Sequence, residues 1–135
     1  MRFVDTNVFL RYLTNDDPAK AKACLALFRR ADGGEEALFT SETVIAEIVY
    51  VLSSKQLYNL SREDIRARLV PLLSMTGLKL PRRQVHLRAL EIYEAHAIDY
   101  EDALAVAHME QQGMTEIYTY DRDFDRLSQV TRLEP

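Results

Sequence analysis

The sequence predicts an α/β domain with a mostly parallel central sheet of four to five strands, covered by helices on both faces. Two observations lead to this prediction. Short apolar runs, typical of buried strands, alternate with longer segments whose apolar residues recur at helical spacing. Capping and turn residues mark the boundaries between them. The apolar runs are residues 3–4, 37–40, 78–81, 117–119 and 130–133.

The first two predicted helices follow the opening strand. Apolar residues at helical spacing predict a helix over 8–13, shortly after Asp5. Asp17 is a suitable N-cap for the next helix, because Pro18 then occupies the first helical position, where no backbone N–H is needed. The pair Gly33-Gly34 ends this helix before the second strand.

Two more predicted helices separate the second strand from the third. Ser41 can cap a helix in which apolar residues between 44 and 52 form a wide arc, and Glu47 lies at the edge of that arc. Ser61 begins the next helix in a capping-box-like arrangement that uses Asp in place of the usual Glu. This helix is expected to run to about Ser74.

The last third of the chain contains helices predicted over 84–97 and 99–113, a short helical turn over 121–127, and the two remaining strands. Asp99 is a candidate N-cap, and Asp102 stands where an acid favours the helix dipole. No repeat or linker interrupts the pattern. A length of 135 residues suits one core, so the sequence predicts a single domain over 1–135.

Composition limits the class of protein. Hydrophobic residues make up 47% of the chain and charged residues 28%, which argues against disorder. The single cysteine, Cys24, excludes a disulfide framework and a cysteine-based zinc site. No apolar segment is long enough for a signal peptide or membrane span, so we expect a cytoplasmic protein. The net charge of -4 argues against a general DNA-coating protein but leaves a nucleic-acid enzyme possible.

Acidic residues recur at strand ends and near helix starts. In a parallel α/β sheet, the loops at the C-terminal ends of the strands line one crevice, so the fold can bring these carboxylates together. Clustered carboxylates repel one another unless a cation lies among them, and a divalent-metal site is therefore the hypothesis they support. The residues concerned are Asp5, Glu47, Asp99, Asp102 and Asp121.

Each acid also has a simpler interpretation. Asp5, Asp99 and Asp102 could act only as helix caps or first-turn acids, and Glu47 could be a solvated helix residue. A calcium loop starting at Asp121 is excluded, because Arg126 and Arg132 stand where its Gly and bidentate Glu would be needed.

Two other kinds of chemistry receive little support. A phosphotransferase with Asp5 as nucleophile would need a further acid two positions on, where the chain has Asn7. The three histidines, His86, His96 and His108, show no metal-ligand spacing, and we expect them at the surface or at helix ends.

Four segments together resemble the PIN-domain ribonucleases of the VapC type, the toxins of type II toxin–antitoxin pairs. The resemblance implies a three-layer α/β/α fold and a Mg²⁺- or Mn²⁺-dependent endoribonuclease that hydrolyses RNA phosphodiester bonds. It extends over nearly the whole chain, and the segments come in the family's order: Val4-Asp5-Thr6-Asn7, Ala46-Glu47, Asp99-Tyr100-Glu101-Asp102-Ala103-Leu104 and Tyr118-Thr119-Tyr120-Asp121-Arg122-Asp123-Phe124.

The resemblance also implies roles for individual residues. The catalytic acids would be Asp5, Glu47, Asp102 and Asp121, with Asp5, Asp102 and Asp121 as metal ligands. Thr6, Asn7 and Thr119 would be supporting residues. Asp99 and Asp123 are counted with the supporting residues, but the resemblance leaves their roles open, and Asp123 could also take the place of Asp121. The arginines that could hold the RNA backbone are Arg11, Arg82, Arg83 and Arg122, the alternative for each being an ordinary solvated charge.

The resemblance further implies an RNA substrate, a homodimer, and a cognate antitoxin protein as inhibitor. Apolar residues in the region of the fourth helix exceed what a small sheet needs, so we expect some of them to meet a second copy or the antitoxin: Leu57, Tyr58, Leu60, Ile65, Leu69, Leu72 and Leu73. The alternative function is a cation-binding or catalytically inactive module that acts through a protein partner.

Overall fold

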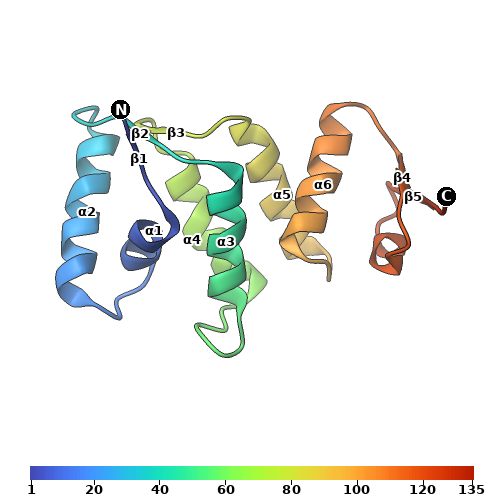
Figure 1. The fold of residues 1–135 in the computed structure, drawn as a ribbon, viewed down its shortest axis with the longest axis horizontal. Coiled ribbons are helices and arrows are strands. Elements are labelled where there is room, and N and C mark those ends of the chain that lie inside the picture. Colours follow the sequence, from blue (N-terminus) through green and yellow to red (C-terminus); the bar gives the residue numbers. More distant parts are fainter. The chain divides into compact units, whose positions relative to one another are not determined.

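The computed structural model describes residues 1–135 and consists of helices and five short strands (Figure 1). Contacts divide the chain into two compact units, Met1–Arg83 and Gln84–Pro135, each of which is described by itself. The assignment of residues 1–135 to a single domain stays a prediction.

In the N-terminal unit, three two-residue strands form a parallel sheet with β2 in the centre. The register pairs Arg2 with Leu38 and Leu38 with Leu78. Parallel neighbours require a crossover, and each crossover here consists of two helices. The elements are β1 (Arg2–Phe3), α1 (Thr6–Leu13), α2 (Pro18–Asp32), β2 (Leu38–Phe39), α3 (Glu42–Ser53), α4 (Arg62–Leu73) and β3 (Leu78–Lys79).

Local capping explains where these helices begin. The Asp17 carboxylate accepts a hydrogen bond from the Lys20 N–H, and Pro18 occupies the first turn, as predicted. Ser61 caps α4 by accepting from the Asp64 N–H at 3.1 Å. Ser41 occupies the N-cap position of α3 but makes no capping hydrogen bond with its side chain.

The core of this unit lies among the helices. Phe28 of α2 packs against Phe9 of α1, with ring centroids 5.3 Å apart. Of the apolar residues assigned above to a partner surface, Ile65, Leu69, Leu72 and Leu73 are fully buried instead. They recur at helical spacing along α4 and complete the core, so only Leu57, which is 61% exposed, remains strongly exposed from that set.

The C-terminal unit holds α5 (Arg83–Ala95), whose first residue belongs to the other unit, α6 (Tyr100–Gln111), β4 (Glu116–Tyr118), a 3₁₀ helix η1 (Arg122–Arg126) and β5 (Thr131–Leu133). Strands β4 and β5 pair in parallel, with Ile117 opposite Arg132. All strand pairs in the molecule are therefore parallel, which confirms the predicted class. The strands are divided between a sheet of three and a sheet of two.

Two arginines connect the elements of the C-terminal unit. Arg88 of α5 donates to both carboxylate oxygens of Glu110 on α6, at 2.7 and 3.0 Å, and this contact lowers the pKa of Glu110. Arg132 of β5 donates to Asp125 in η1 at 3.1 Å and to the Thr119 carbonyl, which follows β4, at 3.3 Å. These contacts hold α6, which carries Asp102, and η1, which carries Asp123.

His86 lies in the first turn of α5, at a helix end, but not at the surface. It is 1% exposed, and its Nδ1 lies 3.3 Å from the Tyr100 hydroxyl at the start of α6. The ring stays hydrogen-bonded although it is buried, which makes its burial tolerable. Elsewhere in the chain, none of the helices combines the length and apolar character needed to cross a bilayer.

Candidate metal centre

Asp5 stands at the C-terminal end of β1, where it caps α1. Its Oδ1 accepts a long hydrogen bond of 3.5 Å from the Val8 N–H. The backbone just before Asp5 is held by a shorter, buried hydrogen bond. The Thr40 hydroxyl, at the end of β2, donates to the Val4 carbonyl at 3.0 Å. Thr40 thereby holds the two strand ends together beside Asp5.

The next residue, Thr6, connects α1 to α3. Its hydroxyl donates to Glu47 Oε2 at 2.7 Å, and its side chain is almost fully buried while the Glu47 carboxylate stays exposed. The hydrogen bond fixes one oxygen of Glu47 and leaves the other available. Within the N-terminal unit, the structure thus connects two of the predicted segments, although they are far apart in sequence. Asn7 lies exposed in the same first turn of α1.

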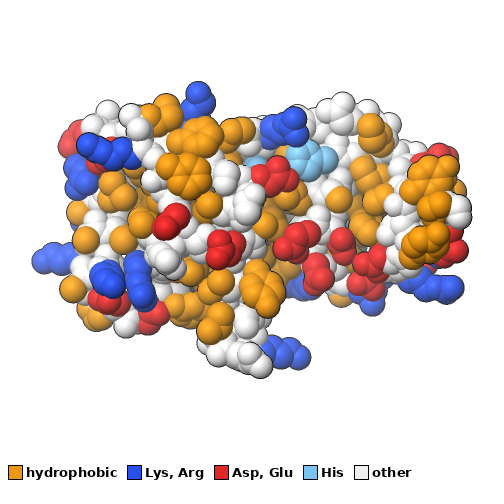
Figure 2. Space-filling view, viewed as in Figure 1, with side chains coloured by type: hydrophobic (Ala, Val, Ile, Leu, Met, Phe, Trp, Pro, Cys, Tyr) orange, Lys and Arg blue, Asp and Glu red, His pale blue; other side chains and the backbone are white.

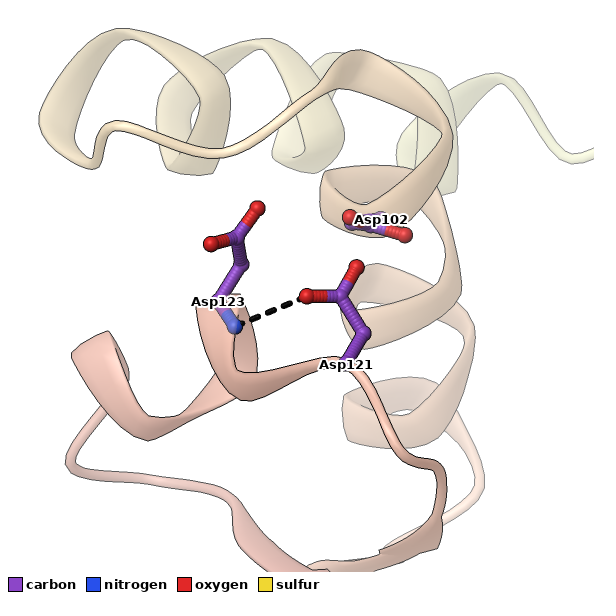
Figure 3. Close-up of side chains that lie close together, drawn as sticks. All are labelled: Asp102, Asp121 and Asp123. Atoms are coloured by element: carbon purple, nitrogen blue, oxygen red, sulfur yellow. Dashed lines mark hydrogen bonds between the residues drawn. The ribbon is translucent and has the colours of Figure 1, made fainter.

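Three carboxylates gather in the C-terminal unit: those of Asp102, Asp121 and Asp123 (Figure 3). One oxygen from each lies within 4.8 Å of the others. Asp102 projects from the first turn of α6, and the other two come from the start of η1. Asp123 was predicted only as a supporting residue of open role.

The turn that holds Asp121 and Asp123 is built by short-range hydrogen bonds. The Thr119 hydroxyl accepts from the Asp121 N–H at 3.0 Å, and Asp121 Oδ1 accepts from the Asp123 N–H at 2.9 Å. These contacts orient the Asp121 carboxylate as the N-cap of η1. Arg126 lies 3.3 Å from Asp123 Oδ1 and offsets part of the local charge from one side.

The pKa of Asp102 is raised, first by burial and then by the negative charges of Asp121, Asp99 and Asp123. Asp99 occupies the N-cap position of α6 but makes no capping hydrogen bond with its side chain. The charge of Asp99 therefore acts on its neighbour although its side chain does not close the helix. Figure 2 shows acidic side chains gathered on the visible face over α6.

This donor set fits a hard divalent cation. Mg²⁺ and Mn²⁺ prefer carboxylate oxygens, and a bound cation would relieve the repulsion that raises the pKa of Asp102. In the C-terminal unit, the structure brings Asp102, Asp121 and Asp123 together. In the N-terminal unit, it brings Glu47 to Thr6, the residue that follows Asp5 in the sequence.

Two of the arginines considered for RNA binding have structural contacts. Arg11 pairs with Asp16 at 3.0 Å, and Arg83 donates to the backbone carbonyls of Met75 and Leu78. Sequence reasoning missed Thr40 and Arg126. For Thr40 the available signal was a polar residue at the end of the predicted strand over 37–40. For Arg126 the only signal was its spacing of three residues from Asp123.

Comparisons with known proteins add a family relationship. The family model of the PIN domain matches residues 2–130. Among solved structures, the chain is similar to the Mycobacterium tuberculosis toxin VapC20, which cleaves the sarcin–ricin loop. The identity is 18%, all of each chain is covered, and the TM-score is 0.40. The comparison with curated proteins gave no match.

Proposed function

We propose that this protein is a metal-dependent endoribonuclease, because the chain belongs to the PIN-domain family and its acidic residues follow the order that the resemblance implies. The observation that supports this most is the convergence of Asp102, Asp121 and Asp123, which come from separate elements of the C-terminal unit. Phosphodiester hydrolysis is the chemistry that such a carboxylate set serves when it binds a divalent cation.

We assign the roles as follows. Asp5, Asp102 and Asp121 would hold Mg²⁺ or Mn²⁺, directly or through water, and Asp123 would orient these ligands or join them. The bound cation would supply Lewis-acid activation of a water molecule and charge compensation at the scissile phosphate. Glu47 would orient the attacking water and accept its proton, since Thr6 fixes one of its oxygens. Asn7, Asp99 and Thr119 would support the site.

The test is cleavage of a panel of unstructured and looped RNAs in Mg²⁺ or Mn²⁺. We expect wild-type protein to cut at least one RNA, and Asp5→Asn and Asp121→Asn to be inactive while remaining folded. Asp64→Asn is the matched control, because Asp64 is also an exposed acid near a helix start but belongs to neither acidic group. If wild-type protein cut none of the RNAs, the inactive cation-binding module would be favoured.

The biological setting we propose is a toxin–antitoxin pair, with a homodimeric toxin in the cytoplasm and a cognate antitoxin as partner. The support is the VapC-type order of the acidic segments within a PIN-domain chain. Light scattering on the isolated chain should give the mass of a dimer. A genomically adjacent small protein should raise the melting temperature by mass action, and a monomer that gains no stability from it would contradict this setting.

A further inference from the structure

We infer that Tyr120, with Tyr118 beside it, is a stacking surface for bases of a single-stranded RNA whose scissile phosphate lies at the acidic site. This inference rests on the proposed function and names a substrate-binding residue for it. It starts from two large side chains that the C-terminal unit leaves in solvent, Tyr118 at 72% and Tyr120 at 70% exposure.

The two tyrosines lie two residues apart at the end of β4 and in the bend after it. Tyr118 is the last residue of β4, and the pairing continues one residue further, because the Thr119 N–H donates to the Leu133 carbonyl at 2.9 Å. Tyr120 lies in the bend that follows β4, and both rings are exposed to solvent on either side of the less exposed Thr119. In Figure 2, hydrophobic side chains lie over β4 with acidic side chains next to them.

The backbone on either side of Tyr120 is fixed. Before it, the Thr119 carbonyl accepts from Arg132 at 3.3 Å, and after it, the Asp121 N–H donates to the Thr119 hydroxyl at 3.0 Å. The exposed ring is therefore carried by an ordered turn rather than by a loose loop. A ring held this way loses little backbone entropy when a flat ligand stacks on it.

The neighbours of Tyr120 favour RNA over a protein partner. Asp121 follows directly and belongs to the acidic cluster, and Arg122 comes next as an exposed cation that can contact a phosphate. Protein interfaces are depleted of charged residues at their centres. In contrast, exposed aromatic rings beside basic groups are typical of sites that bind single-stranded nucleic acid.

The experiment uses the full-length protein and a short unstructured RNA that carries 2-aminopurine at one position, moved along the strand in successive probes. Binding is measured in EDTA, so that fluorescence reports stacking in the absence of cleavage. We expect quenching at one or two probe positions. Tyr120→Ala should weaken binding roughly 5- to 150-fold and abolish that quenching, the range that alanine substitution of a stacking residue gives.

Three comparisons make the result specific. Tyr120→Phe should behave like wild type, because stacking needs the ring and not the hydroxyl. Met114→Ala should also bind normally, because Met114 is a large exposed side chain before the opposite end of β4. In Mg²⁺, Tyr120→Ala should raise KM for RNA cleavage far more than it lowers kcat.

The outcomes separate this inference from the proposed function. Normal RNA binding and quenching by Tyr120→Ala, in a protein whose wild type cleaves RNA, would overturn the stacking role alone. Loss of binding by Tyr120→Phe as well would overturn it in favour of a hydroxyl contact. Loss of self-association in place of RNA binding would assign the tyrosines to a protein interface. A wild-type protein that neither binds nor cuts RNA would overturn the proposed function.

Discussion

At Asp102, burial and the surrounding carboxylates make ionisation unfavourable in the folded protein. The folded state thus holds a proton at this site more tightly than the unfolded chain does. The protonated Asp102 side chain therefore contributes to the stability of the fold at acid pH. This contribution is lost as the pH rises from the ordinary Asp pKa through the raised pKa of Asp102 in the folded protein. Above the raised pKa, the metal-free protein therefore bears the full cost of the charged side chain.

Asp102→Asn should remove this cost. We expect its melting temperature in EDTA at pH 7 to equal or exceed that of wild type, while RNA cleavage is lost. At a pH below the ordinary Asp pKa, the advantage should disappear, because Asp102 is then protonated in both states. Glu63→Gln is the matched control, since it neutralises an exposed acid in the first turn of another helix, α4. A clear loss of stability at pH 7 in Asp102→Asn alone would assign Asp102 to helix capping.

Thr6→Val tests the hydrogen bond that holds Glu47. The substitution keeps the shape of a nearly buried side chain but removes the donor 2.7 Å from Glu47 Oε2. We expect a loss of about 1 kcal/mol in the free energy of unfolding and a fall in kcat as Glu47 loses its orientation. Thr6→Ser keeps the hydroxyl and should restore most of the cleavage rate; urea titration and single-turnover kinetics measure the two effects. Equal cleavage by Val and Ser variants would contradict the positioning role.

Residue-scale predictions from the sequence succeeded where the signal was local. Asp17 with Pro18 and Ser61 acted as helix starts because capping depends on residues three apart. His86 was expected at the surface or at a helix end; it lies in the first turn of α5 but is buried, and Leu90 and Tyr93 follow it at the spacing of one helix face. Its partner Tyr100 lies in another helix, and no local pattern encodes that contact.

At the scale of elements, Gly77 allows the chain entering β3 to pass close to the backbone of α2. A Cβ at this position would lie 2.0 Å from the Ala31 carbonyl oxygen, so backbone would have to move. We expect Gly77→Ala to cost about 3 kcal/mol or more in the free energy of unfolding. Chemical denaturation measures the loss.

Gly113→Ala is the control for Gly77→Ala. Gly113 has a φ of +71°, but a Cβ added there would meet no atom within 4 Å, so the cost of the substitution is conformational strain alone. We expect about 1 to 2 kcal/mol. If the two substitutions cost the same, close packing of the β3 approach on α2 would not be the reason for glycine at position 77.

The elements were predicted closely because each has its own periodicity and boundary residues. The 3₁₀ helix over Arg122–Arg126 falls within the helical turn expected over 121–127, and β5 falls within 130–133. Which strands pair with one another was harder to predict from the sequence. A strand of two or three residues carries too few side chains to specify its neighbour, so the division into sheets of three and two strands was not foreseen.

At the scale of the whole molecule, divalent cations should stabilise the protein because they bind the folded carboxylates and not the unfolded chain. At 100 times the dissociation constant, a single bound cation adds about 2.7 kcal/mol to the free energy of unfolding. We expect Mg²⁺ or Mn²⁺ to raise the melting temperature of wild type and of Asp64→Asn, but much less that of Asp121→Asn. A similar rise in all three proteins would place the binding elsewhere.

The family could be inferred from the sequence because its acidic segments keep their order along the chain, and the PIN-domain match over residues 2–130 agrees with that inference. The predicted common site of Asp5, Glu47, Asp102 and Asp121 stays a prediction. Spacing along a chain identifies residues that can meet, whereas the closeness of Asp123 to Asp102 and Asp121 depends on how η1 turns after β4.

The division of the acidic residues along the chain has a consequence for protein synthesis. A ribosome completes residues 1–83, with Asp5, Thr6 and Glu47, before it begins the unit that contains Asp102, Asp121 and Asp123. A nascent chain paused between the two units contains all three strands of the first sheet but still lacks the carboxylates that gather beside α6. Translation therefore supplies the carboxylates of Asp102, Asp121 and Asp123 only after residues 1–83 have been made.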